Sequence, residues 1–393
     1  MAKHNKTVFL KGLFFNDNTI PFFEKITYQT KTLYTIKSTN IKNTKNTFYE
    51  VVDVPGYLDT YITNEARKLK KIQLKTLKGY LVETEKYTTV EEYLTANFGT
   101  KSRSNLRRYK NRLEKCFNIT YTCYYGDITK EKYNSLFIAL KALLIRRFEE
   151  KKENNYELRH FDEYQDTIYN LILKKEASIF VIYNDQKPIS IRINMFKKTL
   201  GYYIMSCYDI DYSKFHLGSL DMLKNIEWCI ENNTATYDLL KGYDYYKKDW
   251  KTTTFDFYNC IIYDPSSIQA SFNAYAKKTK TKGTYLLYYT LKKINFITYY
   301  KRVKQKLYKQ THNAITEKKI THTKIEENQL TANSIQLDFE KNEAYSYLKR
   351  TIFNLLFTSK EHYKDIKVYK NLDNKNNFYV VAKNNKWSLN IID

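Results

Sequence analysis

Residues 206–251, SCYDIDYSKFHLGSLDMLKNIEWCIENNTATYDLLKGYDYYKKDWK, decide the fold that this sequence predicts. They read as a strand end, a loop, an amphipathic helix, a second strand and a basic aromatic turn. In the loop, Gly218 lets the backbone approach a ligand closely, and Ser219 is expected to open the helix. The free N–H groups of a first helical turn attract anions, and Lys214 and His216 stand just upstream. We therefore predict a phosphate or pyrophosphate site in this loop.

The elements around this segment follow a regular order. Apolar residues recur every three or four positions from Met222 to Ile230, so the helix after the loop should bury one face against a sheet. The flanking predictions, in chain order, are helices at 129–151 and 160–175, strands at 177–183, 189–196 and 199–207, and, after the loop and its helix, strands at 236–240 and 253–263.

In the order and spacing of its motifs, the sequence resembles a known family, the GNAT-fold acyltransferases. The resemblance is to the branch related to cellulose-biosynthesis acetyltransferases and to the Fem peptidoglycan-bridge transferases. The matching motifs are the Tyr-Tyr-x-Met strand, the loop from Tyr208-Asp209 through Lys214-Phe215 to Gly218-Ser219, and the ending Asp238-x3-Gly242-x3-Tyr246-Lys247-x2-Trp250. Leu217 departs from the pattern, because the branch typically has Pro there. The resemblance covers roughly residues 100–265.

The resemblance implies an α/β (α+β) fold, with a GNAT-type mixed sheet flanked by helices in a tandem GNAT-like arrangement. A C-terminal helical and small α/β appendage would follow. The expected domains are an N-terminal α/β portion at 1–99 as the first GNAT-like half, an acyl-CoA-binding GNAT domain at 100–265, basic aromatic helices at 266–310, a linker at 311–334 and a small α/β appendage at 335–393.

The resemblance also implies the co-substrate, acetyl-CoA or another acyl-CoA. The strand end near Ser206 would separate from the strand at 236–240 and bind the pantetheine arm, and a backbone N–H would stabilise the oxyanion. The residues expected to bind the cofactor are Ser206, Cys207, Lys214, His216, Gly218, Ser219 and Leu220.

Four polar side chains are expected at the reaction end, where an amine or hydroxyl acceptor loses a proton. Asp209 would accept that proton, and Tyr208 or Tyr246 would return one to the leaving thiolate. Lys247 would hold an anionic acceptor. No metal site is expected, and the five cysteines, without a C-x2-C pair, indicate neither a disulfide framework nor zinc.

Charge is the strongest compositional signal. Sixty-six Lys and Arg against 42 Asp and Glu leave a net charge of +24, which attracts nucleic acid, anionic membranes or acidic cofactors. A Thr89–Glu92 capping box is expected to open a short helix. The basic run at 101–115 either binds a phosphate or a lipid headgroup or is a solvated helix face. The Lys- and Tyr-rich composition is equally what an AT-rich genome would produce.

The chain shows no apolar run of the ~18 residues that a membrane helix needs, and the start MAKHNKTVFL lacks a signal-peptide core. We therefore expect a cytoplasmic protein, or one peripheral at the inner membrane surface. Within 266–310, Leu287, Leu291 and Ile294 form a candidate buried stripe. Contact of that helix with an anionic membrane surface is the alternative.

The function expected from these features is an acyl-CoA-dependent N- or O-acyltransferase acting on an amino sugar, a lipid-linked saccharide or another envelope precursor. Two alternatives stay open. One is Fem-like aminoacyl transfer from charged tRNA, for which the positive charge would be useful. The other is a non-catalytic module on a degenerate GNAT fold that binds nucleic acid or a membrane surface. The acyl group, the acceptor and the oligomeric state are not indicated.

Overall fold

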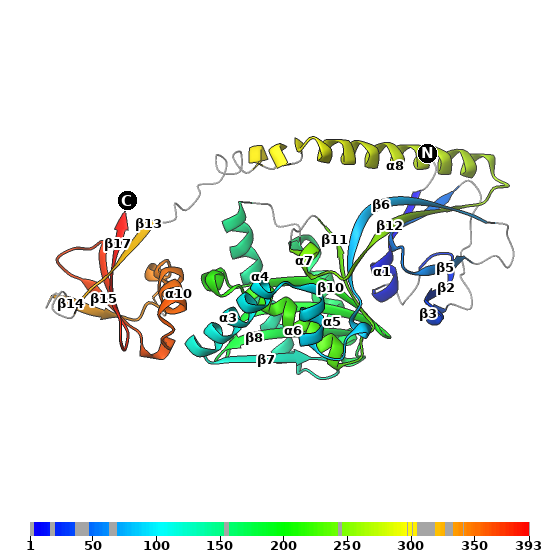
Figure 1. The fold of residues 1–393 in the computed structure, drawn as a ribbon. Coiled ribbons are helices and arrows are strands. Elements are labelled where there is room, and N and C mark those ends of the chain that lie inside the picture. Colours follow the sequence, from blue (N-terminus) through cyan, green and yellow to red (C-terminus); the bar gives the residue numbers. More distant parts are fainter. Residues whose placement is uncertain are drawn as a thin grey trace. The chain divides into compact units, whose positions relative to one another are not determined.

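The computed structural model describes residues 4–15, 20–35, 47–62, 69–152, 157–242, 246–296, 298–300, 302–304, 319–326, 333–340 and 342–392 (Figure 1). These residues form two compact units. Unit 1 combines Met1–Lys86, Met195–Ile204 and Asn232–Lys304, and unit 2 combines Tyr87–Asn194, Met205–Glu231 and Gln305–Asp393. Neither unit is continuous in sequence.

A nine-stranded mixed sheet has the order β1-β4-β12-β6-β11-β10-β9-β8-β7. Its strands are β1 His4–Val8, β4 Phe48–Pro55, β6 Lys70–Val82, β7 Ile119–Tyr124, β8 Ala177–Asn184, β9 Lys187–Lys197, β10 Leu200–Tyr208, β11 Thr236–Lys241 and β12 Thr253–Tyr263. β1 pairs in parallel with β4 and β10 with β11, whereas β12 is antiparallel to both β4 and β6. The predicted class, a large mixed sheet flanked by helices, is confirmed.

The strand meander predicted upstream of the loop is confirmed as β8, β9 and β10. β8 reads as a nearly continuous apolar run because it is buried on both faces. β9 is equally buried, but Ser190, Arg192 and Asn194 alternate there with apolar residues. β12 begins and ends where the sequence predicts a strand.

The register of β11 changes along its length. Its parallel ladder with β10 pairs Leu200–Tyr202 with Thr236–Asp238. Its antiparallel ladder with β6 shifts between Asp238 and Lys241. Leu240 adopts a positive φ of 62° inside this irregularity, as expected where a bulge re-aims side chains. The strand therefore ends in a distorted segment that leads to Gly242.

The helices of unit 2 are α2 Val90–Asn97, α3 Thr100–Cys116, α4 Lys130–Lys151, α5 Phe161–Leu173, α6 Leu217–Glu231 and α10 Leu348–Ser359, with 3₁₀ turns η2 Glu157–His160, η3 Ile210–Phe215, η5 Glu343–Tyr345 and η6 Tyr363–Asp365. Thr89 caps α2 as predicted, because its hydroxyl accepts the Glu92 amide. Thr129 caps α4 in the same way.

The C-terminal part of unit 2 is a five-stranded sheet of order β13-β17-β16-β15-β14 beside α10. Its strands are β13 Lys319–Lys324, β14 Ser334–Leu337, β15 Lys367–Asn371, β16 Asn377–Val381 and β17 Lys386–Ile392. β13 falls within the stretch expected to be a linker, because alternating β-branched residues pair there with β17. The apolar cluster beside this sheet includes Phe117, the C-cap residue of α3, and Phe215 of η3.

In the described residues, unit 1 also contains a three-stranded sheet and further helices. They are β2 Phe23–Tyr28, β3 Lys31–Thr35 and β5 Asp59–Ile62, with α1 Phe9–Phe14, α7 Lys247–Trp250, α8 Ile268–Lys293 and the turn η1 Thr84–Lys86. α8 runs alongside β6 and β12 (Figure 1). The predicted buried stripe of this helix was wrong, because Leu287 and Ile294 are exposed and its buried residues are Ala270, Ala274 and Thr281. Small residues allow a helix to lie close to a sheet, so they, rather than the bulky ones, face it.

None of the helices in the described residues combines the length and apolar character that a bilayer crossing requires.

Candidate functional site

The segment between β10 and α6 is more ordered than the predicted loop. Asp209 caps η3, since its carboxylate accepts the amide of Asp211 at 3.1 Å. His216 then adopts a left-handed conformation with φ 52°, and α6 begins at Leu217. The prediction that Ser219 opens the helix was wrong, because the Ser219 amide already donates to the carbonyl of His216 at 2.9 Å.

Gly218 lies in the first turn of α6 and does not have a positive φ. A Cβ atom added there would lie 2.9 Å from Cε1 of Tyr208. The same Tyr208 ring lies under the Arg147 guanidinium, whose Cζ is 4.4 Å from the ring centroid. The absence of a side chain at Gly218 therefore leaves space for the Tyr208 ring. Gly218 would affect a ligand site indirectly, by setting the position of that ring.

Asp209 is surrounded by cations in unit 2. Its buried carboxylate accepts hydrogen bonds from Arg146 Nη1 at 2.9 Å and from Lys187 Nζ at 3.2 Å. Arg146 also holds Asp211 through two hydrogen bonds of 2.7 and 2.9 Å. Burial, together with the neighbouring Asp209, raises the pKa of Asp211, while Arg146 opposes the shift. The lone pairs of Asp209 are thus engaged in holding η3, which favours an anchoring role over proton acceptance.

Lys214 and His216 come together at a cavity of about 430 Å³ in unit 2. Its lining residues are Arg108, Tyr109, Ser213, Lys214, His216 and Phe357. The His216 imidazole stacks on Tyr109 with a centroid distance of 3.9 Å. Burial and the neighbouring Arg108 lower the pKa of His216, so the imidazole is neutral at pH 7 and can both donate and accept.

This cavity joins three segments that are far apart in sequence. Arg108 comes from the basic helix α3, Lys214 from η3, and Phe357 from α10 in the C-terminal part. Arg112 places its guanidinium 4.4 Å from the Phe357 ring centroid. The cavity thus combines two cations with aromatic surfaces, which suits a ligand that carries both a phosphate and a planar ring.

The remaining predicted cofactor residues differ in burial. Cys207 is fully buried in β10, and Leu220 is buried in the apolar cluster of unit 2. Ser206 is more exposed than either of them and is partly buried. In the described residues no three His, Cys, Asp or Glu side chains gather as a metal site would require.

A second group of polar residues lies in unit 1, at the end of β11. Asp238 is fully buried and accepts the Tyr57 hydroxyl at 2.7 Å and the Leu240 amide at 2.7 Å. Burial raises the pKa of Asp238 to about 7, although these hydrogen bonds and the nearby Lys247 ammonium favour the charged form. The Tyr202 hydroxyl is buried close by and has no hydrogen-bond partner of standard geometry. Asp238 can therefore gain or lose a proton near neutral pH.

Lys247 and Tyr246 belong to this second group. Lys247 is only 4% exposed, and its ammonium donates to the Lys241 carbonyl at 3.4 Å and lies 5.0 Å from the Tyr203 ring centroid. Tyr246 is 37% exposed and donates to the Tyr203 hydroxyl at 3.3 Å. Of the two, only Tyr246 presents its side chain to solvent.

The predicted catalytic residues thus fall into two sets. Tyr208 and Asp209 belong to unit 2, and Tyr246 and Lys247 belong to unit 1. Sequence reasoning missed the buried Asp238 as a site residue, although its place in the Asp238-x3-Gly242 spacing was a signal. Tyr57 gave no signal, because 39 of the 393 residues are Tyr.

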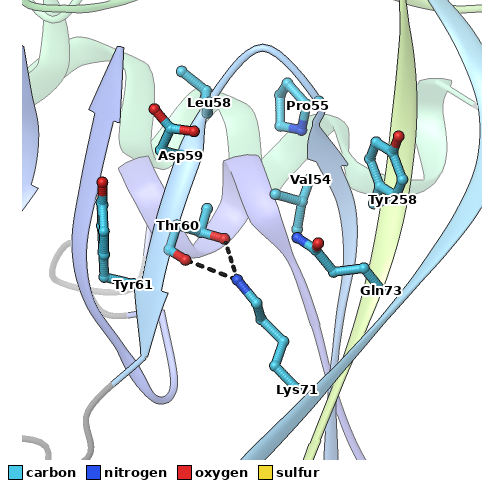
Figure 2. A pocket seen from close by; sticks show the side chains of 10 residues that line it. Val54, Pro55, Leu58, Asp59, Thr60, Tyr61, Lys71, Gln73 and Tyr258 are labelled. Carbon is cyan, nitrogen blue, oxygen red and sulfur yellow. Dashed lines mark hydrogen bonds between the residues drawn. The ribbon is translucent and has the colours of Figure 1, made fainter. Parts of the chain in front are cut away.

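A further pocket of about 330 Å³ lies in unit 1 among β4, β5, β6 and β12 (Figure 2). Of the described residues that line it, Lys71 is the only lysine, and its ammonium donates to the carbonyl and the hydroxyl of Thr60 at 2.7 and 3.0 Å. None of the predicted site residues lines it.

Comparisons with known proteins support part of the predicted family. No curated protein matches the sequence. Among solved structures, the chain is similar to a conserved protein of unknown function from Bacteroides thetaiotaomicron VPI-5482, with 12% identity, 55% of this chain and 70% of that chain covered, and a TM-score of 0.38. It is also similar to FemX, with 13% identity, 47% of this chain and 62% of that chain covered, and a TM-score of 0.34. A tandem GNAT protein from the clavulanic acid biosynthesis pathway is similar as well, with 7% identity, 54% of this chain and 63% of that chain covered, and a TM-score of 0.30. Similarity this low does not identify a function. Residues 100–248, however, match the family model described as an acetyltransferase (GNAT) domain, so this region is similar to a GNAT acetyltransferase domain.

Proposed function

We propose that this protein is an acyl-CoA-dependent N- or O-acyltransferase whose acceptor is an amino sugar, a lipid-linked saccharide or another envelope precursor. The observation that carries the proposal is the match of residues 100–248 to the GNAT acetyltransferase domain. Such chemistry needs no covalent intermediate on the protein. The chain has to hold a thioester beside a nucleophile, take a proton from that nucleophile and return one to the thiolate.

The cavity in unit 2 is the proposed site for the phosphate-bearing end of the acyl-CoA. Arg108 and Lys214 supply positive charge, while Tyr109, His216 and Phe357 supply surfaces against which a purine can pack. The C-terminal part would then contribute to cofactor binding through Phe357. Under this proposal Tyr208, which Gly218 accommodates, forms the floor next to the α6 N-terminus.

The polar group in unit 1 is the proposed proton-handling site. Asp238 is the only one of these residues that combines full burial with a pKa near 7. Its carboxylate accepts a hydrogen bond from the Tyr57 hydroxyl. A fully buried carboxylate does not touch the acceptor, so Asp238 would act through the tyrosine hydroxyl. Tyr246, which is exposed, is the proposed donor to the thiolate.

The proposal is tested by calorimetric titration of the full chain with acetyl-CoA and with longer acyl-CoAs. We expect saturable binding that free CoA competes for, and acyl transfer in a panel of amino-sugar and hydroxyl acceptors followed by thiol release. A folded protein that binds no CoA ester at low ionic strength would overturn the proposal. The second candidate, aminoacyl transfer from tRNA, is favoured by the +24 charge, and it predicts salt-dependent tRNA affinity without CoA affinity.

A matched pair of glycine substitutions tests the role of Gly218. Gly218→Ala should weaken acyl-CoA binding by about tenfold, because the new Cβ forces the Tyr208 ring to move. Gly283→Ala is the control, since a Cβ there meets no atom within 4 Å and the change should stabilise α8 by about 0.5–1 kcal/mol. Calorimetry and urea unfolding of both variants give the two readouts.

A double variant decides whether Tyr208 is the cause. With Tyr208→Ala already present, Gly218→Ala should bring no further loss of affinity. A further tenfold loss in that background would show that the glycine contacts the ligand directly.

A further inference from the structure

Helix α8 carries an apolar stripe that faces solvent. Ile268, Phe272 and Leu286 are 88%, 73% and 71% exposed, and Tyr275 is half exposed. Their spacing of four, three and eleven residues places all four on one side of the helix, within an arc of about 60°. Isolated exposed apolar residues are common, but several large ones on one side of a helix mark an interaction surface.

The stripe is not a failed core face, because α8 already packs on its own unit through the opposite side. Ala270 and Ala274 are fully buried in a cluster with Leu74 and Ile261 of the sheet. On a helical wheel Ala270 and Ala274 lie about 200° and 240° from Ile268, so the exposed apolar residues point away from the sheet. Ala270 and Ala274 therefore hold the helix close to the sheet, whereas Ile268, Phe272 and Leu286 point outward.

Positive charge accompanies the exposed stripe. From Pro265 to Thr316 the sequence contains no Asp or Glu. Lys282 and Lys293 are exposed and continue the same side of the helix, and Lys278 lies 4.9 Å from the Tyr275 ring centroid. One lysine, Lys277, is committed to Glu50 at 3.0 Å. A helix with bulky apolar residues among lysines, and no acidic residue, has the composition of an interfacial membrane helix.

We propose that the exposed face of α8 docks on an anionic membrane surface, with the helix lying flat and its apolar side chains inserted below the headgroups. The apolar residues favour a bilayer over nucleic acid, because a phosphate backbone is recognised by cations and does not need exposed Ile, Phe and Leu. A second copy of the chain is disfavoured, since pairing two such faces would bring their lysines together. The inference does not depend on the proposed acyl-transfer chemistry.

The experiment is co-sedimentation of the full chain with vesicles of phosphatidylcholine alone and of phosphatidylcholine mixed with phosphatidylglycerol. Binding should require the anionic lipid and should weaken as salt is raised. The triple variant Ile268→Ser, Phe272→Ser, Leu286→Ser keeps the charge and should lower the partition coefficient by at least about tenfold. The matched control is Thr279→Ser with Thr290→Ser, two exposed polar positions of the same helix, and it should bind as the wild type does.

Three outcomes would overturn the proposal. The first is absence of binding to anionic vesicles by the wild-type protein. The second is equal binding by the triple variant, which would reduce the interaction to unspecific charge. The third is a wild-type oligomer, measured without vesicles, that the triple variant abolishes, because the stripe would then be an interface between copies. Circular dichroism of each variant confirms that α8 remains folded.

Discussion

Asp238→Asn is expected to lower kcat by roughly 10²-fold or more while the protein stays folded, because the amide cannot take up the proton that the proposed mechanism passes through Tyr57. The wild-type rate should rise with pH through about 7, the pKa to which burial raises Asp238, since only its ionised form accepts a proton. In the Asn variant that rising limb should disappear. The measurement is the pH profile of kcat/KM with the acceptor that the screening panel yields.

Stability gives a second readout for the same substitution. A carboxyl whose pKa is raised on folding contributes stability that is fully present below its unfolded pKa of about 4 and is lost as pH rises toward 7. Asn has no charge to desolvate, so the variant should be at least as stable as the wild type at pH 8. Its advantage should vanish near pH 4.

Asp249→Asn is the matched control, because this exposed carboxylate lies in α7, eleven residues along the chain. It should leave both the rate profile and the stability profile unchanged. If Asp238→Asn kept the wild-type pH profile, the Tyr57–Asp238 pair would be structural support only.

Local patterns explain why much of the fold was predictable. The Thr89 cap and the apolar spacing in α4 and α5 act within a few residues, so sequence alone identifies them. The buried meander is equally local in part, because β8 is covered on both faces and reads as a nearly continuous apolar run. These elements appear in the structure close to their predicted bounds.

The loop before α6 was harder, because two capping residues competed. Ser219 has the residue type of an N-cap, but Asp209 caps an earlier 3₁₀ turn and His216 ends it in a left-handed conformation. The start of α6 at Leu217 is the result of that earlier turn. No count of apolar positions detects such an insertion.

The polar groups at the centre of both units depend on contacts between distant residues. Tyr57 and Asp238 are 181 positions apart, so no spacing rule connects them. In α6, periodicity identified the apolar face but not Asp221 and Asn225, which are also buried. Their partners Arg192 and Asn194 come from β9, and only the fold brings them within hydrogen-bond distance.

Arg192→Met is expected to lower the free energy of unfolding by roughly 3–5 kcal/mol, because it leaves Asp221 as an unpaired buried charge. Both side chains are almost completely buried. The guanidinium donates through Nε at 2.7 Å and through Nη2 to the same carboxylate oxygen. Urea unfolding at pH 7 measures the loss, and Lys224→Met is the control. Lys224 pairs with Glu227 on the same helix at 2.6 Å but remains partly exposed, so its removal should cost less than about 1 kcal/mol.

The double variant Arg192→Met with Asp221→Leu tests the physical reason for that loss. Removing both charges together also removes the desolvation penalty, so most of the lost stability should return. If the double variant were as unstable as Arg192→Met alone, the cost would lie in packing at β9 and not in the orphaned carboxylate. Asp221 stands one turn from the N-terminus of α6, so the same pair fixes where that terminus lies. We therefore expect acyl-CoA affinity to fall in Arg192→Met and to recover in the double variant along with stability.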